Sequence, residues 1–152
     1  MKNIFFFLVF IPLVFACSSD SKIEDINLHI GDIHEGGIVY GLNTTSSGGA
    51  IVTMVDIGIG DWYEAENMAE NNSTGGNDDW YLPSIYQLQY IYDSVGQGAG
   101  NIAGFEHSRY WSSTSTGGWG DYYWAFDFGT GESFIGLYPS ANARVRAVRS
   151  FD

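Results

Sequence analysis

Residues 80–88, which read Trp-Tyr-Leu-Pro-Ser-Ile-Tyr-Gln-Leu, constrain the fold of this chain more than any other segment. Pro83 favours an extended conformation in the residue before it and cannot continue a helix backwards from itself. Ser84 can cap a helix that begins at Ile85. Gln87 completes a capping box, in which each of the two side chains accepts from the other residue's backbone N–H. The pattern therefore predicts an extended aromatic segment that turns into a helix at Ser84.

The same reasoning predicts one more helix before this segment. Asp61 and Glu64 have capping-box spacing, and the apolar residues that follow Asp61 recur at helical intervals, which predicts a helix over residues 62–71. The helix that Ser84 caps should run over residues 85–92. Residues 93–104 are rich in glycine and show no periodicity, so we expect a long loop there.

Strand signals lie on both sides of the helices. Two β-branched runs, 38–40 and 50–55, flank a polar turn cluster and predict a hairpin. The remaining strand signals are residues 110–114, 122–128, 133–138 and 143–151.

Two of the C-terminal strands carry more specific patterns. In the first, aromatic residues alternate, which predicts that one face of the strand is the main core face. These aromatic residues are Tyr122, Trp124, Phe126 and Phe128.

The last strand, residues 143–151, has an irregular pattern. Val145 and Ala147 alternate with Arg144 and Arg146, but Val148 falls on the arginine side. Either a bulge interrupts the strand, or one arginine is held inward by a carboxylate. The arginines are expected to pair with carboxylates, because the chain has 18 acidic residues against six lysines and arginines.

The order of these elements is that of a C-type-lectin-like domain, and four sequence blocks make the resemblance more specific. They are residues 36–40, 80–84, 110–114 and 145–151. The blocks resemble those of a bacterial family named for the C-terminal domain of the Legionella collagen-like adhesin. The resemblance implies an α+β fold over residues 31–152, with two helices, twisted antiparallel sheets, a long loop region and paired N- and C-terminal strands.

The resemblance also implies surface display and, in the adhesin, binding of sulfated polysaccharide. This chain departs from that pattern, because Tyr81 stands where the family usually has arginine and the net charge is -12. Neither sulfated glycans nor nucleic acid are expected partners, since both require a basic surface. Beyond residue 16 the cationic side chains are Lys22, Arg109, Arg144, Arg146 and Arg149.

The N-terminus predicts export and a lipid anchor. Residues 1–16 have the layout of a signal peptide, with Lys2 before an apolar run that is too short to span a bilayer. The run ends in Val-Phe-Ala before Cys17, the single cysteine, which resembles a lipoprotein lipobox. We expect residues 17–30 to be the lipidated cysteine and a flexible tether, and the protein to be lipid-anchored at the outer membrane or cell surface. The alternative is an ordinary secretory signal that is cleaved after Ala16.

No catalytic or cofactor site is expected. With Cys17 used for lipid, the domain has no thiol, and the three histidines do not have metal-ligand spacing. No nucleophile elbow is present, so we expect no enzyme activity, cofactor or metal. One alternative remains open at residues 77–79, where Asn77, Asp78 and Asp79 offer oxygens that calcium prefers; otherwise they form a solvated turn.

The candidate ligand-binding residues are Trp119, Asp121 and Tyr122, followed by Asp78 and Asp79. Trp119 stands between glycines, where an exposed ring could stack on a sugar or a peptide side chain, although it could instead fold back onto the long loop as part of the core. The expected function is non-catalytic recognition of a neutral glycan or a protein ligand through the long-loop side. The alternative is a structural or assembly lipoprotein that packs against another envelope protein.

Overall fold

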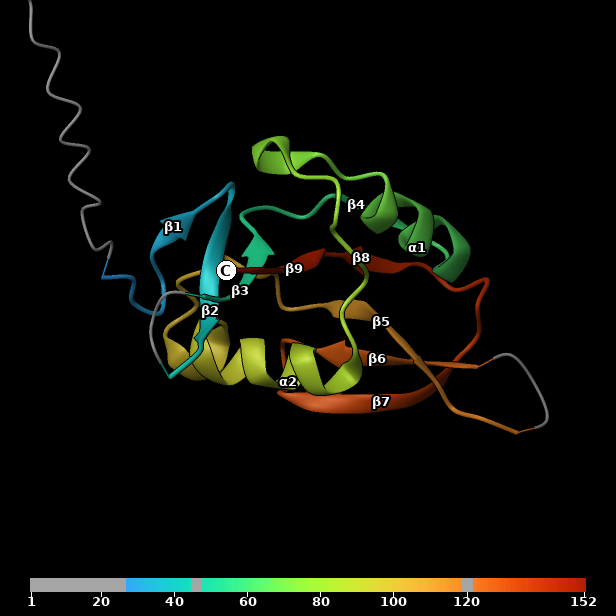
Figure 1. Ribbon diagram of the computed structural model, residues 1–152. Helices are drawn as coiled ribbons and strands as arrows, with labels where there is room; N and C mark the ends of the chain where they lie inside the picture. Colours follow the sequence, from blue (N-terminus) through green and yellow to red (C-terminus); the bar gives the residue numbers. More distant parts are fainter. Residues whose placement is uncertain (1–26, 45–47, 119–121) are drawn as a thin grey trace, which may run out of the picture.

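The computed structural model of the chain describes residues 27–44, 48–118 and 122–152, which form two helices and two sheets (Figure 1). The helices are α1 (Trp62–Glu70) and α2 (Ile85–Ser94), with short 3-10 turns η1 (Thr74–Gly76) and η2 (Gln97–Ala99). One sheet has the order β1 (Ile33–His34), β2 (Gly37–Leu42), β3 (Gly49–Thr53), β9 (Val148–Phe151). The other has the order β4 (Gly58–Gly60), β8 (Ala143–Val145), β5 (Arg109–Ser115), β6 (Tyr123–Asp127), β7 (Glu132–Leu137).

Both predicted helices are confirmed, together with the caps that start them. In the first cap, the Glu64 N–H donates to the Asp61 carboxylate and the Asp61 N–H to the Glu64 carboxylate, both at 2.9 Å. In the second, the Gln87 N–H donates to Ser84 Oγ at 3.2 Å and the Ser84 N–H to Gln87 Oε1 at 2.9 Å. Local chemistry therefore sets where each helix begins.

The N-terminal hairpin is also confirmed, since β2 and β3 pair antiparallel with an irregularity between Val39 and Gly41. The C-terminal strand β9 joins this sheet by pairing antiparallel with β3, so both ends of the domain lie in one sheet (Figure 1). The first and last strands, which we expected to pair with each other, lie at opposite edges of this sheet, because β2 and β3 stand between β1 and β9. Leu28, which we placed in the tether, is buried against the core, with 8% of its surface exposed. Residues 1–26 lie outside the described part.

The prediction of a single strand over residues 143–151 is wrong, because the segment is divided between the two sheets. Its first part, β8, pairs with β4 and β5, and its second part, β9, pairs with β3. Between them Arg146 turns inward and is only 2% exposed. The interruption and the inward arginine, which we considered as alternatives, occur together.

Alternate residues of the strands face two different cores. Trp111 and Ala125 belong to the core that contains α1 residues, whereas Tyr110 and Phe126 belong to the core that contains α2 residues. The aromatic face predicted for β6 is therefore only part of the arrangement, because the strand is buried on both sides. Of the four alternating aromatic residues, Phe126 and Phe128 are fully buried, whereas Tyr122 and Trp124 are half-buried.

The long loop after α2 is shorter than predicted and is itself packed. Helix α2 continues to Ser94, and η2 occupies part of the remainder. Ala103 and Phe105 are each 2% exposed and lie in the core shared with α2. This segment lies at the opposite end of α2 from the β5–β6 connection in Figure 1.

Candidate functional site

The structure does not bring the predicted ligand-binding residues into one site. Trp119 and Asp121 lie outside the described residues. Tyr122 lies just before β6, whereas Asp78 and Asp79 lie in the segment between η1 and α2, and Figure 1 shows these two places well separated. The segment after α2 lies in a third place, at the far end of that helix from the start of β6.

Asp79 is engaged by Arg149 of β9. Arg149 Nε donates to Asp79 Oδ1 at 2.5 Å and Nη2 donates to Oδ2 at 3.2 Å, and Nη1 donates to Glu35. The hydrogen bond from Arg149 lowers the pKa of Asp79, so the carboxylate stays ionised and serves as a counter-ion. Arg149 is only 8% exposed, so Asp79 and Glu35 together neutralise a buried charge, and Asp79 has a structural partner in addition to any contact with a ligand.

Tyr122 forms a pair with Tyr138, which follows β7. Their ring centroids are 4.8 Å apart at an interplanar angle of 57°. The hydrogen bond with the Tyr138 side chain raises the pKa of Tyr122, so the Tyr122 phenol stays neutral at physiological pH. Tyr138 is 63% exposed, which leaves its ring free to contact a ligand.

A bulge in β7 sets the position of Tyr138. Tyr123 of β6 pairs with Leu137 of β7, and Ala125 pairs with Phe134. Between these two pairs β7 therefore has one residue more than β6. Gly136 supplies the positive φ, 82°, that this irregularity needs. Phe134 and Leu137 consequently both pack on the core, while Ile135 turns outward and is 63% exposed.

The tyrosine pair stands on a rigid support. Trp62, the first residue of α1, stacks on Tyr123 with ring centroids 3.6 Å apart. Its Nε1 donates to the Ser112 carbonyl at 2.9 Å, and its backbone N–H donates to the Pro139 carbonyl at 2.8 Å. One tryptophan thus joins α1, β5 and the segment after β7, which holds the neighbourhood of Tyr138 in place.

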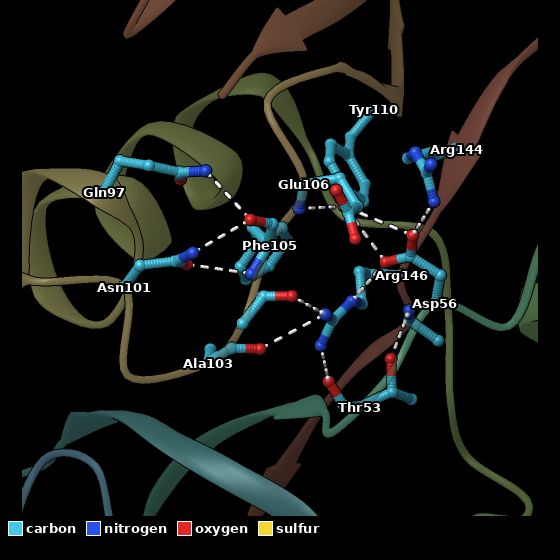
Figure 2. Close-up of polar contacts among 12 residues, drawn as sticks. Thr53, Asp56, Gln97, Asn101, Ala103, Phe105, Glu106, Tyr110, Arg144 and Arg146 are labelled. Atoms are coloured by element: carbon cyan, nitrogen blue, oxygen red, sulfur yellow. Dashed lines mark hydrogen bonds and ion pairs between the residues drawn. The ribbon is translucent and has the colours of Figure 1, made fainter. Parts of the chain in front are cut away.

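The most extensive buried polar network surrounds Arg146 and Asp56 (Figure 2). Arg146 Nε donates to Asp56 at 2.7 Å and Nη2 donates to the Ala103 and Gly104 carbonyls, both at 3.1 Å. The guanidinium carbon lies 4.3 Å from the centroid of the Phe105 ring. Arg146, which lies between β8 and β9, therefore binds the segment after α2 to the point where the chain passes from one sheet to the other.

Asp56 is the carboxylate shared by this network. It accepts from Arg144 Nη1 at 2.7 Å and from the Tyr110 hydroxyl at 3.0 Å (Figure 2). Burial raises the pKa of Tyr110 to about 12. The sequence contained one signal for this network, the arginine at an apolar position of the last strand, but nothing that identified Asp56 as its partner.

A family model for the Lcl C-terminal domain matches residues 38–149, which covers the chain from β2 into β9. The chain belongs to the Lcl C-terminal domain family. A search of curated proteins gave no match. Family membership and the two-helix, two-sheet architecture confirm the predicted C-type-lectin-like α+β fold. Membership also supports an adhesin-like domain exposed at the cell surface.

In this Lcl C-terminal domain, the described residues contain no group of three His, Cys, Asp or Glu side chains that could hold a metal ion. Asp78 is exposed, and its neighbour Asp79 is paired with Arg149. Within the same described ranges, no helix has the length and apolar character needed to cross a bilayer.

Proposed function

We propose that this Lcl C-terminal domain is a non-catalytic recognition module that binds a neutral glycan or a protein ligand at the cell envelope. The observation that carries the proposal is the Tyr122–Tyr138 pair, an exposed and uncharged aromatic surface on a rigid support. Aromatic rings with a polar hydroxyl are well suited to recognition, since they contribute large contact area and a directional hydrogen bond. No cofactor or metal is needed for this role.

The pairing of the arginines supports a neutral ligand. Arg109 lies 3.6 Å from Asp127, Arg144 and Arg146 share Asp56, and Arg149 pairs with Asp79 and Glu35. The predicted arginine–carboxylate pairs are thus all formed in the described part. A sulfated polysaccharide or nucleic acid requires cationic groups that are not already neutralised, so such ligands fit this surface poorly.

The proposal predicts that Tyr138→Ala weakens ligand binding about tenfold while leaving stability nearly unchanged, because the exposed ring contributes contact area and little core packing. The full chain, purified in detergent, is applied to an array of neutral glycans, and in parallel crosslinked in envelope preparations. Glu132→Ala, a change at an exposed residue of β7, the strand that precedes Tyr138, is the control. Unchanged binding by Tyr138→Ala would mean that ligand recognition lies elsewhere.

The alternative, a structural or assembly lipoprotein, is favoured by a different observation. Strand β7 is at the edge of its sheet, paired only with β6, and presents Ile135 with 63% of its surface exposed. An exposed edge strand can pair with a strand of another protein. An array without hits, combined with one crosslinked envelope protein whose capture is lost in Ile135→Lys, would favour assembly.

The anchor is part of the proposal. We propose that Cys17 carries a diacylglyceryl group that holds the protein at the outer membrane or cell surface, since two acyl chains anchor stably whereas one does not. A fatty-acid analogue should label the wild-type protein, and Cys17→Ser should lose all label and move to the soluble fraction. Equal labelling of the two proteins would refute lipidation at this cysteine.

A further inference from the structure

Residues 80–92 contain no charged side chain, although the chain as a whole has 18 acidic residues. Much of this segment is nevertheless at the surface. Tyr86 is 79% exposed, Tyr90 is 54% exposed and Tyr81 is 38% exposed. Tyr86 and Tyr90 are four residues apart on α2 and so share one helix face. We call the group Tyr40, Tyr81, Tyr86, Gln87 and Tyr90 the Gln87 tyrosine surface.

Gln87 organises this surface through its amide group. Its Nε2 donates to the Tyr81 hydroxyl at 2.9 Å and to the Tyr40 hydroxyl at 3.3 Å. Its Oε1 accepts from the Ser84 N–H, as part of the cap of α2. The amide is therefore fixed on both sides, and the Tyr81 hydroxyl that accepts from it keeps its own proton available to donate.

The rings of Tyr81 and Tyr90 are held in place before any ligand arrives. Tyr81 exchanges two backbone hydrogen bonds with Val148 of β9, both at 2.9 Å. Tyr90 meets the ring of Tyr40 edge to face, with centroids 6.2 Å apart and an interplanar angle of 69°. Gly41 of β2 lies against the Tyr90 ring as well, since a Cβ on Gly41 would lie 3.3 Å from that ring. Such preorganisation lowers the entropy lost on binding.

We propose that the Gln87 tyrosine surface binds a neutral oligosaccharide. The inference rests on the proposed recognition role. It narrows the ligand to a neutral oligosaccharide and adds a second contact surface, built from α2 and its neighbours and separate from Tyr122 and Tyr138. Exposed tyrosine rings offer flat faces on which the C–H faces of sugar rings stack, and phenol and amide groups offer hydrogen bonds to sugar hydroxyls. A row of rings along a helix face suits several linked sugar units.

The chemistry of the surface favours a sugar over a protein partner. Its exposed side chains are tyrosines. The other largely exposed side chains of α2 are Gln89 and, near the end of the helix, Asp93, and neither is aliphatic. A protein interface normally has an apolar centre and a rim with charged side chains. The absence of charge over residues 80–92 also selects against sulfated or uronic acid polymers, which would gain no ion pair here.

The test uses the full chain in detergent with three probes: neutral hexasaccharides of glucose, of mannose and of N-acetylglucosamine. Binding is measured by calorimetry. We expect at least one probe to bind, and Tyr86→Ala and Tyr90→Ala each to weaken it about five- to tenfold, which corresponds to the loss of one stacked ring. Tyr86→Phe should stay within about twofold, because the ring is retained. Tyr63→Ala, at a 56% exposed tyrosine of α1, is the matched control and should not change binding.

Three results would overturn the proposal. The first is that none of the probes binds. The second is that binding is lost in Tyr138→Ala but kept in Tyr86→Ala and Tyr90→Ala, which would support the proposed function while removing this surface from it. The third is that the wild type is a dimer in sedimentation and Tyr86→Ala makes it monomeric, since the surface would then be covered by a second copy.

Discussion

Asp56→Ala should reduce the free energy of unfolding by about 3–5 kcal/mol, because it leaves a buried guanidinium without its counter-ion. Arg146 is 2% exposed, and Asp56 is the carboxylate that its Nε contacts. The same change also removes the partner of Arg144 and of the Tyr110 hydroxyl. Urea denaturation followed by tryptophan fluorescence measures the loss, since Trp62, Trp80 and Trp111 all report on the core.

Two further variants test whether this loss comes from the buried ion pair. Asp78→Ala removes an exposed carboxylate elsewhere in the chain and should change the free energy of unfolding by less than about 0.5 kcal/mol. The double variant Asp56→Leu with Arg146→Met should recover part of the stability, because an apolar pair can replace a buried ion pair with little penalty. A loss below about 1 kcal/mol in Asp56→Ala would show that hydrogen bonds to the carbonyls of Thr53, Ala103 and Gly104 are enough to stabilise the buried guanidinium.

The parts of the fold that were predictable depend on neighbours in sequence. The caps at Asp61 and Ser84 use side chains three residues away, so residue types and spacing were enough to place both helix starts. The hairpin of β2 and β3 was predictable for the same reason, because its turn cluster and its β-branched runs are contiguous.

The division of the last strand into β8 and β9 was not predictable in the same way. The irregularity was visible in the order Val145, Arg146, Ala147, Val148. Its resolution depends on Asp56, which is 90 residues from Arg146 in the chain, and on carbonyls of the segment after α2. Long-range partners of this kind leave no periodicity in a single sequence. The pattern could therefore indicate a bulge or an inward arginine, but it could not decide between them.

Contacts between residues far apart in the sequence also limited the prediction of the candidate site. Asp79 was identified as a residue that offers carboxylate oxygens, but its pairing with Arg149, 70 residues away in the chain, could not be predicted from the sequence. Tyr122 was identified from its place next to Trp119 and Asp121 in the sequence, whereas its partner Tyr138 depends on the bulge at Gly136. Tyr81, Tyr86 and Gln87 of the Gln87 tyrosine surface lie within residues 80–88, the segment that gave the clearest fold signal, and had been interpreted only as structural.

Gly75→Ala should destabilise the domain by about 2–5 kcal/mol, through a backbone clash and an unfavourable φ together. Gly75 of η1 has φ 71°, and a Cβ there would lie 2.1 Å from the Glu35 carbonyl oxygen. The contact is reciprocal, since a Cβ on Gly36 would lie 2.7 Å from the Gly75 Cα. The two glycines thus let η1 pack directly on the turn between β1 and β2.

The adjacent Gly76 provides the matched control for this prediction. It has a similar positive φ, 78°, but a Cβ there would meet nothing within 4 Å. Gly76→Ala should therefore show only the conformational penalty, roughly 1 kcal/mol, and the difference between the two variants measures the backbone contact. Equal losses in urea denaturation would mean that η1 can move away from the β1–β2 turn at little cost. In that case the ion pairs of Arg149 with Glu35 and Asp79 would keep Glu35 in place without support from η1.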